Sequence, residues 1–315
     1  MPMREVRLPA LEKWLARADL ARVPGRGAYA WLAEASALPD PPPYAAIALA
    51  GEGEPREGPW MRADPVHLRI NRDLVSLYDA STLDLSAPEA EVLAAALQAL
   101  FKDDDLEFFV PAPERWYVRV PGDLPVTTPL ERAIGRDIFG LLPNGGSLNW
   151  RSFMTEAQMV LSNHDVNGRR EVAGQPAVNS VWFWGEGTCP PNVVLPFDRI
   201  VAGEPFARGL ARLAGASALD VPASLAELAL PAKDKETLVV LDDLVRPYRR
   251  GNTETWLATA RSLDERWFAG LGDVARKTGG VRVILPGEKD TVIATLAPST
   301  RWRMLRTRKA VSHHA

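Results

Sequence analysis

The stretch from Arg151 to Gly187 gathers side chains that suit the binding of a small anion. Arginine offers a rigid fork of donors to phosphate or carboxylate, asparagine can donate to and accept from a hydroxyl, and histidine titrates near neutral pH. These residue types together predict a site for a phosphorylated or acidic metabolite. The candidate ligand-binding residues are Asn167, Arg169, Arg170, Asn179, Trp184 and, from an earlier segment, Arg119.

His164 is the candidate acid or base beside this set. We expect three of the side chains to converge on one concave site with His164 at its edge: Asn167, Arg170 and Asn179. A structural interpretation stays open, because asparagine is a common turn former, adjacent arginines are often exposed, and a lone histidine in a polar loop often has a structural hydrogen bond. In that alternative, a buried arginine holds a loop together.

No complete set of metal ligands is evident. A two-metal site for phosphoryl transfer needs several carboxylates and usually histidines. Asp242 and Asp243 follow a predicted strand at a position where α/β proteins bind ligands, although solvation on a helix or loop is the favoured explanation for this pair. The glycine pair at Gly145 and Gly146 lacks the ending that cradles a nucleotide phosphate, so it predicts a turn. We therefore predict no metal and no cofactor.

Composition and charge exclude several classes of protein. The net charge of −3 over 315 residues argues against a general nucleic-acid binder, and no apolar run approaches the length of a membrane span. Cys189 is the only cysteine, so no intramolecular disulfide can form and a reducing compartment is expected. We expect a cytoplasmic protein whose partner is an anionic small molecule or another protein, with the oligomeric state left open.

The elements that must position these residues alternate between helices and strands. The periodicity predicts helices over residues 3–37 with breaks at Pro24 and Gly25, a buried strand over Tyr44–Ala50, and a hairpin from Val66 to Tyr78. Further predicted elements are a helix that starts at a capping box of Ser86 and Glu89, strands Leu106–Val110 and Trp116–Val120, a helix capped by Thr128, a helix Trp150–Ser162 and a strand Val181–Trp184. Trp182 and Trp184 share one face of that strand, where they can floor a cleft or fill a core.

The last third predicts a strand–helix–strand unit. Strands Leu238–Leu241 and Val281–Leu285 are expected to be parallel neighbours covered by a helix over Thr253–Lys277, with Thr291–Leu296 as an edge strand. The predicted organisation has three parts: an N-terminal helical segment and Pro-rich linker (1–43), an α/β region (44–300) that can contain an inserted subdomain at 66–185, and a basic tail (301–315).

Four strings carry a family resemblance: RADPVHL, RWYVRV, TEAQMVLSNHDVNGRR and GQPAVNSVWFWGEG. They resemble the bacterial regulatory protein family of RpfE type, and more distantly the archaeal-type cofactor-independent phosphoglycerate mutases of the alkaline-phosphatase superfamily. The distant resemblance rests on His164, Val166, Asn167 and Arg170, and then on Pro176, Ala177 and Asn179. It implies an alkaline-phosphatase-like α/β fold, a layered sheet with helices on both faces, in truncated form.

The departures from the mutase pattern are as informative as the matches. Those enzymes begin with an Asp-Gly metal motif, supply a Ser or Thr nucleophile, and end with Asp and His metal ligands, whereas this chain has Pro39-Asp40-Pro41-Pro42 where a nucleophile is sought. The resemblance therefore implies a catalytically depleted, regulatory protein that binds an anionic metabolite or a partner. Two alternatives stay open: an active phosphomutase or phosphatase with an atypical site, and a structural interaction protein with a tryptophan dimer face.

Overall fold

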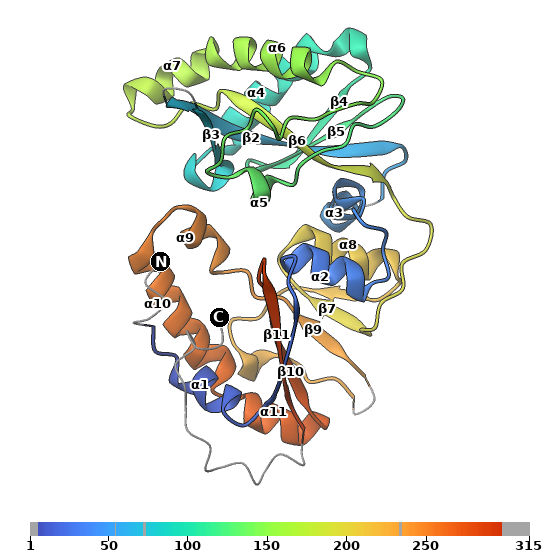
Figure 1. Cartoon of the computed structure of the whole chain (residues 1–315), viewed down its shortest axis with the longest axis vertical. Coiled ribbons are helices and arrows are strands. Elements are labelled where there is room, and N and C mark those ends of the chain that lie inside the picture. Colours follow the sequence, from blue (N-terminus) through green and yellow to red (C-terminus); the bar gives the residue numbers. More distant parts are fainter. Residues whose placement is uncertain (1–5, 54, 72–73, 233–234, 298–315) are drawn as a thin grey trace. The chain divides into compact units, whose positions relative to one another are not determined.

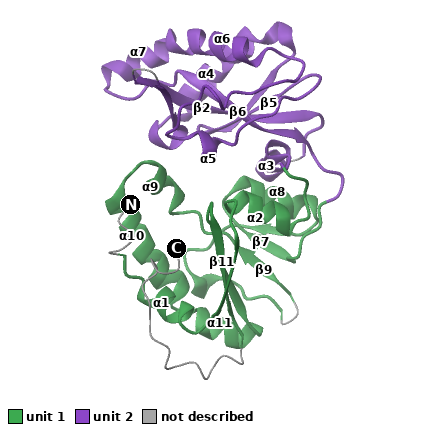
Figure 2. Cartoon of the chain, in the orientation of Figure 1, with its two compact units in different colours: residues 1–40, 193–315 green, residues 41–192 purple. Residues whose placement is uncertain are grey.

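The computed structural model describes residues 6–53, 55–71, 74–232 and 235–297. They fall into two compact units (Figure 2): unit 2 is residues 41–192, and unit 1 combines residues 1–40 with 193–315. The predicted subdomain at 66–185 lies inside unit 2, while the predicted N-terminal segment 1–43 is divided between the units. The predicted basic tail lies outside the described residues.

Unit 2 is a five-stranded sheet in the order β3-β2-β5-β4, with β6 paired to β2, and all of its pairings are antiparallel. Helices α4, α6 and α7 form a layer on one face (Figure 1). Helix α3 packs on the other face, because its Tyr44 stacks on Trp184 of β6 while the adjacent Phe183 meets Trp150 of α6. The elements are α3 (Tyr44–Glu52), β2 (Pro59–Asn71), β3 (Leu74–Asp79), α4 (Ala87–Leu100), β4 (Glu107–Ala112), β5 (Arg115–Arg119), α5 (Leu130–Ala133), α6 (Trp150–Ser162), α7 (Asp165–Val172) and β6 (Ser180–Thr188).

Most predictions for unit 2 are confirmed. The β2–β3 hairpin, strands β4 and β5, helix α6 and strand β6 all lie at the predicted positions, and α4 starts at the predicted capping box. The strand predicted over Tyr44–Ala50 is wrong, since these residues form helix α3. Its run is buried on all sides and so has no diagnostic period, and its four alanines favour a helix.

Unit 1 contains two small sheets. One is antiparallel in the order β1-β11-β10, and the other is parallel in the order β8-β7-β9. The elements are α1 (Pro9–Leu15), β1 (Asp19–Pro24), α2 (Ala28–Ala35), β7 (Arg199–Val201), α8 (Pro205–Leu213), β8 (Ser217–Leu219), β9 (Thr237–Val239), α9 (Val245–Arg249), α10 (Thr253–Leu263), a π-helical turn (Asp264–Phe268), α11 (Leu271–Thr278), β10 (Val281–Leu285) and β11 (Asp290–Leu296).

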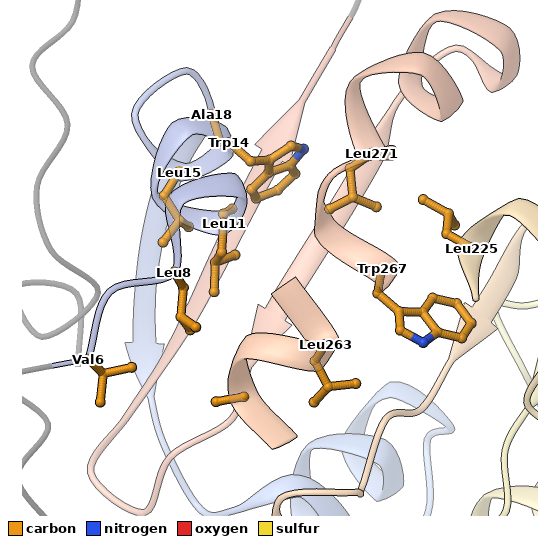
Figure 3. Packing of buried hydrophobic residues seen from close by; sticks show 12 residues of the cluster. Val6, Leu8, Leu11, Trp14, Leu15, Ala18, Leu225, Leu263, Trp267 and Leu271 are labelled. Carbon is orange, nitrogen blue, oxygen red and sulfur yellow. The ribbon is translucent and has the colours of Figure 1, made fainter. Parts of the chain in front are cut away.

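A hydrophobic cluster joins α1 to the π-helical turn and α11 (Figure 3). Trp14, Leu263, Trp267 and Leu271 are buried in it. Asp264 strengthens this contact, because its carboxylate accepts hydrogen bonds from the backbone N–H groups of two residues at the start of α1, at 2.9 and 2.8 Å. The long predicted helix Thr253–Lys277 is therefore divided by a π-helical turn whose Asp264 caps α1.

Three predictions for unit 1 are wrong. Strands β9 and β10 lie in separate sheets, so the parallel crossover does not form; β10 instead pairs with β11 through a short connection, which closes a local hairpin. β11 lies at the centre of its sheet, not at an edge. The N-terminal segment is also not purely helical, since β1 pairs with β11. The mixed α/β class is confirmed in both units, and no helix of the described residues is long and apolar enough to cross a membrane.

Candidate functional site: an arginine face

The predicted ligand-binding residues Asn167, Arg170 and Asn179 lie around the connection between α7 and β6. The Asn167 amide nitrogen donates to the carbonyls of Leu161 and Val178 at 2.7 and 2.8 Å, and its oxygen accepts from the Val178 N–H at 2.8 Å. Every hydrogen bond of this buried side chain therefore goes to the backbone of its own chain. Asn167 ties the end of α6 to the start of β6.

Arg170 is buried with only 1% of its surface exposed. Its Nε donates to the carbonyl of Pro176 at 2.9 Å, one terminal nitrogen donates to Glu89 at 3.1 Å, and the other donates to the carbonyl of Leu83. The guanidinium therefore joins α4, the segment before it and the α7–β6 connection. These acceptors occupy the donor fork that an anion would need.

The side chain of Asn179 forms two hydrogen bonds with the backbone of strand β2, as a neighbouring strand would. Its oxygen accepts from the Leu68 N–H at 2.7 Å and its nitrogen donates to the Leu68 carbonyl at 2.9 Å. We name Asn167, Arg170 and Asn179 the α7–β6 clamp. The structure brings the three side chains to one connection, but the acceptors and donors that they meet are those of the chain, which favours the structural interpretation.

The two remaining predicted residues of this region do not join the clamp. His164 is the N-cap of α7, where its Nδ1 accepts from the Val166 N–H at 3.2 Å. Arg169 is exposed on the outer side of α7, where it lines a surface depression with Asp165 and Gly168. The histidine therefore stabilises a helix start, and the arginine points away from the clamp.

Arg119 and Trp184, also predicted, lie on the face of the sheet that α3 covers. On β5, Arg115, Tyr117 and Arg119 share one face, since side chains alternate along a strand. The strand register places Arg62 of β2 opposite both Tyr117 and Trp184, so this face continues across β2 to β6. We name it the arginine face, defined by Arg56, Arg62, Arg115 and Arg119.

The inner part of the arginine face is a closed ion pair. The Arg62 guanidinium donates to the Asp64 carboxylate, through Nε at 3.0 Å and through one terminal nitrogen, while the indole N–H of Trp184 donates to the other carboxylate oxygen at 2.7 Å. Burial is the largest single influence on the pKa of Arg62 and acts to lower it, but the charge and hydrogen bond of Asp64 together with the neighbouring tyrosines raise the pKa well above its ordinary value. Arg62 therefore stays charged and already has its counter-ion.

The network continues from Arg62 to α3. Arg62 donates to the Tyr117 hydroxyl at 3.4 Å, and that hydroxyl donates to Glu52 at 3.2 Å. Burial raises the pKa of Tyr117, so the phenol keeps its proton and can donate it. Arg115 closes the network with a two-point ion pair to Glu52, at 2.6 and 3.1 Å, while 38% of its side chain stays exposed.

The outer part of the arginine face is more open. Arg119 pairs with Glu107 at 2.9 Å, and both side chains are exposed. Arg56 lies before β2 with its guanidinium carbon 3.8 Å from the centroid of the Phe109 ring, and it forms no hydrogen bond or ion pair with another described residue. Phe109 is in register with Tyr117, the residue midway between Arg115 and Arg119. Arg56, Arg115 and Arg119 thus border the aromatic pair of Phe109 and Tyr117, and Arg56 has no anionic partner in the described chain.

The sequence interpretation included Arg119 and Trp184 but missed Arg56, Arg62 and Arg115. A signal for two of them lies just outside the predicted strands, since Arg62 precedes the predicted strand at Val66 and Arg115 precedes the one at Trp116. Extending these strands to the observed bounds of β2 and β5 places Arg62 on one face with Asp64, and Arg115 on one face with Arg119, because side chains two or four residues apart share a face. Arg56 lies in a loop of Gly, Glu and Pro residues, where no period places its side chain.

In unit 1, Asp242 and Asp243 follow β9, as predicted. Although Asp242 is exposed as a residue, shielding of its carboxyl group from water raises its pKa, and the neighbouring Asp243 charge adds to this. Across the described ranges, no group of three or more His, Cys, Asp or Glu side chains is placed to hold a metal ion.

Comparison with known proteins gives the chain a distant relationship. No family model matches it. It is 27% identical over 179 residues to the 2,3-bisphosphoglycerate-independent phosphoglycerate mutase of Methanosarcina acetivorans, a match that covers 52% of this chain and 45% of the relative. It is 30% identical over 132 residues to a probable enzyme of the same name from Geobacter sulfurreducens, covering 41% of this chain and 33% of the relative. The chain is thus a distant homologue of these mutases that matches less than half of their length.

Two solved structures are similar over most of their length. A cofactor-independent phosphoglycerate mutase from Thermoplasma acidophilum aligns with a TM-score of 0.43 and 17% identity, over 94% of this chain and 84% of that one. A protein from Pyrococcus horikoshii aligns with a TM-score of 0.49 and 13% identity, over 98% and 84% of the two chains. The resemblance to the RpfE-type regulatory family stays a prediction.

Proposed function

We propose that this protein is a regulatory relative of the cofactor-independent phosphoglycerate mutases that binds a phosphorylated carboxylic acid of the phosphoglycerate type on its arginine face, without turning it over. The distant homology supports the class of ligand, because the matched relatives are named for phosphoglycerate. The arginine face supports the mode of binding, because guanidinium groups recognise both phosphate and carboxylate by two-point hydrogen bonds.

Arg56 is the observation that carries the proposal. It is a half-buried cation held over Phe109, without an anionic partner in the described chain. Stacking on an aromatic ring fixes the plane of a guanidinium while its edge keeps every N–H donor available. A phosphate group can therefore bind to this edge without breaking an ion pair within the described chain.

Arg115 and Arg119 supply the second anchor in this proposal. A phosphoglycerate carries a carboxylate besides its phosphate, and the two arginines flank Tyr117 on β5, next to the Phe109 ring that holds Arg56. The Arg119–Glu107 pair is exposed, and such a pair contributes only about 0 to 1 kcal/mol, so a ligand can displace it. The buried Arg62–Asp64 pair instead keeps the inner face rigid.

The alternative of an active phosphomutase or phosphatase predicts that a base and a nucleophile meet the bound phosphate. His164 caps α7, and α7 belongs to the helical layer on the opposite face of the sheet from α3 (Figure 1). A binding role for the arginine face therefore needs no contribution from the candidate base. We propose that binding is read out as a change in conformation or in affinity for a protein partner.

Isothermal titration calorimetry with 3-phosphoglycerate tests the proposal. We expect the wild-type protein to bind in the presence of a chelator, and Arg56→Ala to weaken binding by about 1.5 to 3 kcal/mol, roughly 10- to 150-fold, the worth of a hydrogen bond to a charged group. Melting of the variant should stay unchanged. Arg69→Ala is the matched control, since Arg69 is exposed on β2 but lies outside the arginine face.

Equal affinity of the wild type and Arg56→Ala would remove the arginine face from the proposal. Turnover of 3-phosphoglycerate or of 2-phosphoglycerate by the wild type, followed by phosphorus NMR with and without Mn²⁺, would replace the regulatory role by the enzymatic alternative.

A further inference from the structure

The outer face of α7 is a separate feature that the proposed function does not use. Asp165, Gly168, Arg169 and Val172 line a surface depression of about 480 Å³. They are spaced three, four and seven residues apart, so they lie along one side of the helix. Val172 is 91% exposed, the largest exposure among the exposed large apolar residues that the structure describes. We name these four residues the α7 face.

The two charged side chains of the α7 face are unpaired within the described chain. Asp165 and Arg169 are one helical turn apart, where ion pairs commonly form, yet neither has a hydrogen-bond or ion-pair partner among the described side chains. The N-cap role that an acidic residue could take here belongs to His164. The α7 face therefore presents one negative and one positive group outwards, with their charges unsatisfied.

Gly168 leaves the α7 face open between these charges. A side chain at this position would meet no atom within 4 Å, so packing inside the chain does not require a glycine. A glycine in a helix costs about 0.5 to 1 kcal/mol relative to alanine, because it loses more backbone freedom on folding. Its effect here is to let another backbone approach α7 closely.

We propose that the α7 face binds the α7 face of a second copy of this chain in an antiparallel, two-fold symmetric contact. A two-fold axis beside Gly168 places Asp165 of each copy within one helical turn of Arg169 of the other, so that two ion pairs form across the contact. It also covers both copies of Val172, which gain from leaving water.

The balance of charge selects this partner over others. The face carries one charge of each sign at an interval of four residues, which is complementary to itself when reversed but has no net attraction for an anion or for a basic or acidic peptide. Because α7 has only 8 residues, the contact is small and the dimer is expected to be weak and reversible.

Sedimentation equilibrium from about 1 µM to 1 mM tests the contact over the range expected for weak association. We expect a monomer–dimer equilibrium for the wild type. Asp165→Arg and Arg169→Asp should each weaken it at least about tenfold, because each places like charges together, and the double variant with both changes should restore it to within about threefold. Circular dichroism confirms that the exposed substitutions leave the fold intact.

The exchange of Asp273 and Arg276 on α11 is the matched control, since both are exposed and belong to unit 1, and it should leave the equilibrium unchanged. A monomer across the whole range would overturn the proposal. Dimerisation that resists both single changes, or a double variant that fails to recover, would overturn it as well, because association would then use another surface.

Discussion

The α7–β6 clamp and the arginine face belong to the same unit and use the same kind of side chain in opposite ways. In the clamp, Arg170 donates to two carbonyls and one carboxylate of its own chain and is almost wholly buried. On the arginine face, Arg56 rests on an aromatic ring and meets no anion of the described chain. The difference indicates that the acceptors already bound to a guanidinium decide whether its donors stay available to a ligand.

The polar side chains of the clamp stabilise the fold, whereas those at the outer edge of the arginine face are available for binding. The clamp satisfies backbone groups at a connection that has no ladder to satisfy them, which is why its amides and guanidinium are buried and fully used. The arginine face has a similarly satisfied inner pair, Arg62 and Asp64, but Arg56 at its outer edge has no anionic partner in the described chain. Stability and binding should therefore respond to different arginines.

Arg170→Ala should produce the largest effect, a loss of about 3 to 5 kcal/mol of unfolding free energy, because it removes a buried cation that pairs with Glu89 and leaves two carbonyls without donors. Chemical denaturation measures it. If the variant unfolds at the wild-type denaturant concentration but no longer binds 3-phosphoglycerate, the roles assigned to the clamp and the arginine face are reversed.

Asn167→Ala should come next, with a loss of about 1 to 3 kcal/mol, since the backbone groups of Val178 lose their partners in a buried place. Affinity for 3-phosphoglycerate should not change. Asn163→Ala is a suitable control, because Asn163 is an exposed asparagine at the end of α6 that bonds within its own helix. A similar loss of unfolding free energy in both variants would mean that the clamp stabilises the fold no more than an exposed asparagine does.

Glu89→Gln should cost about 1 kcal/mol at neutral pH, the usual worth of a helix cap. Burial of Glu89 acts to raise its pKa, but hydrogen bonds from Ser86 and Arg170 outweigh it and lower the pKa. A lowered pKa stabilises the fold above the ordinary pKa of glutamate, and this contribution is lost as the pH falls. The difference between variant and wild type should therefore shrink below about pH 4, which melting at a series of pH values would reveal. A difference that is constant with pH would assign the loss to something other than the ionised carboxylate.

Chelation of metal ions should have the smallest effect, since we expect it to leave the stability of the protein unchanged. Neither the clamp nor the arginine face uses a metal ion in this account, so dialysis against a chelator should leave the melting temperature unchanged. A stoichiometric ion that survives dialysis without chelator, and whose removal lowers the melting temperature by several degrees, would require a metal site that the account omits.

The sequence predicted the elements of unit 2 better than the roles of their side chains. Alternation located the β2–β3 hairpin, and a capping box located the start of α4. Both signals are local. The sequence could not predict the three acceptors of the Arg170 guanidinium. They belong to Leu83, Glu89 and Pro176, and only the tertiary fold brings these residues together.

Unit 1 was harder to predict for the same reason. Strands β7, β8 and β9 have three residues each, too few for a period to emerge. The prediction also paired β10 with the distant β9, although the short connection to β11 allows a local hairpin. α3 shows the complementary failure, since a run that is apolar on every side has no face to reveal its period. Burial of a short segment hides its secondary structure from the sequence.

The most direct test of the central claim is an NMR titration that observes each guanidinium separately. With arginine labelled by ¹⁵N and the Nε–H signals of Arg56 and Arg170 assigned through the variants Arg56→Lys and Arg170→Lys, 3-phosphoglycerate is added to saturation. The account predicts a saturable shift of the Arg56 signal and a stationary Arg170 signal, because of these two arginines only Arg56 lacks an acceptor in the described chain. A shift of Arg170 with Arg56 stationary, or no shift of either, would contradict it.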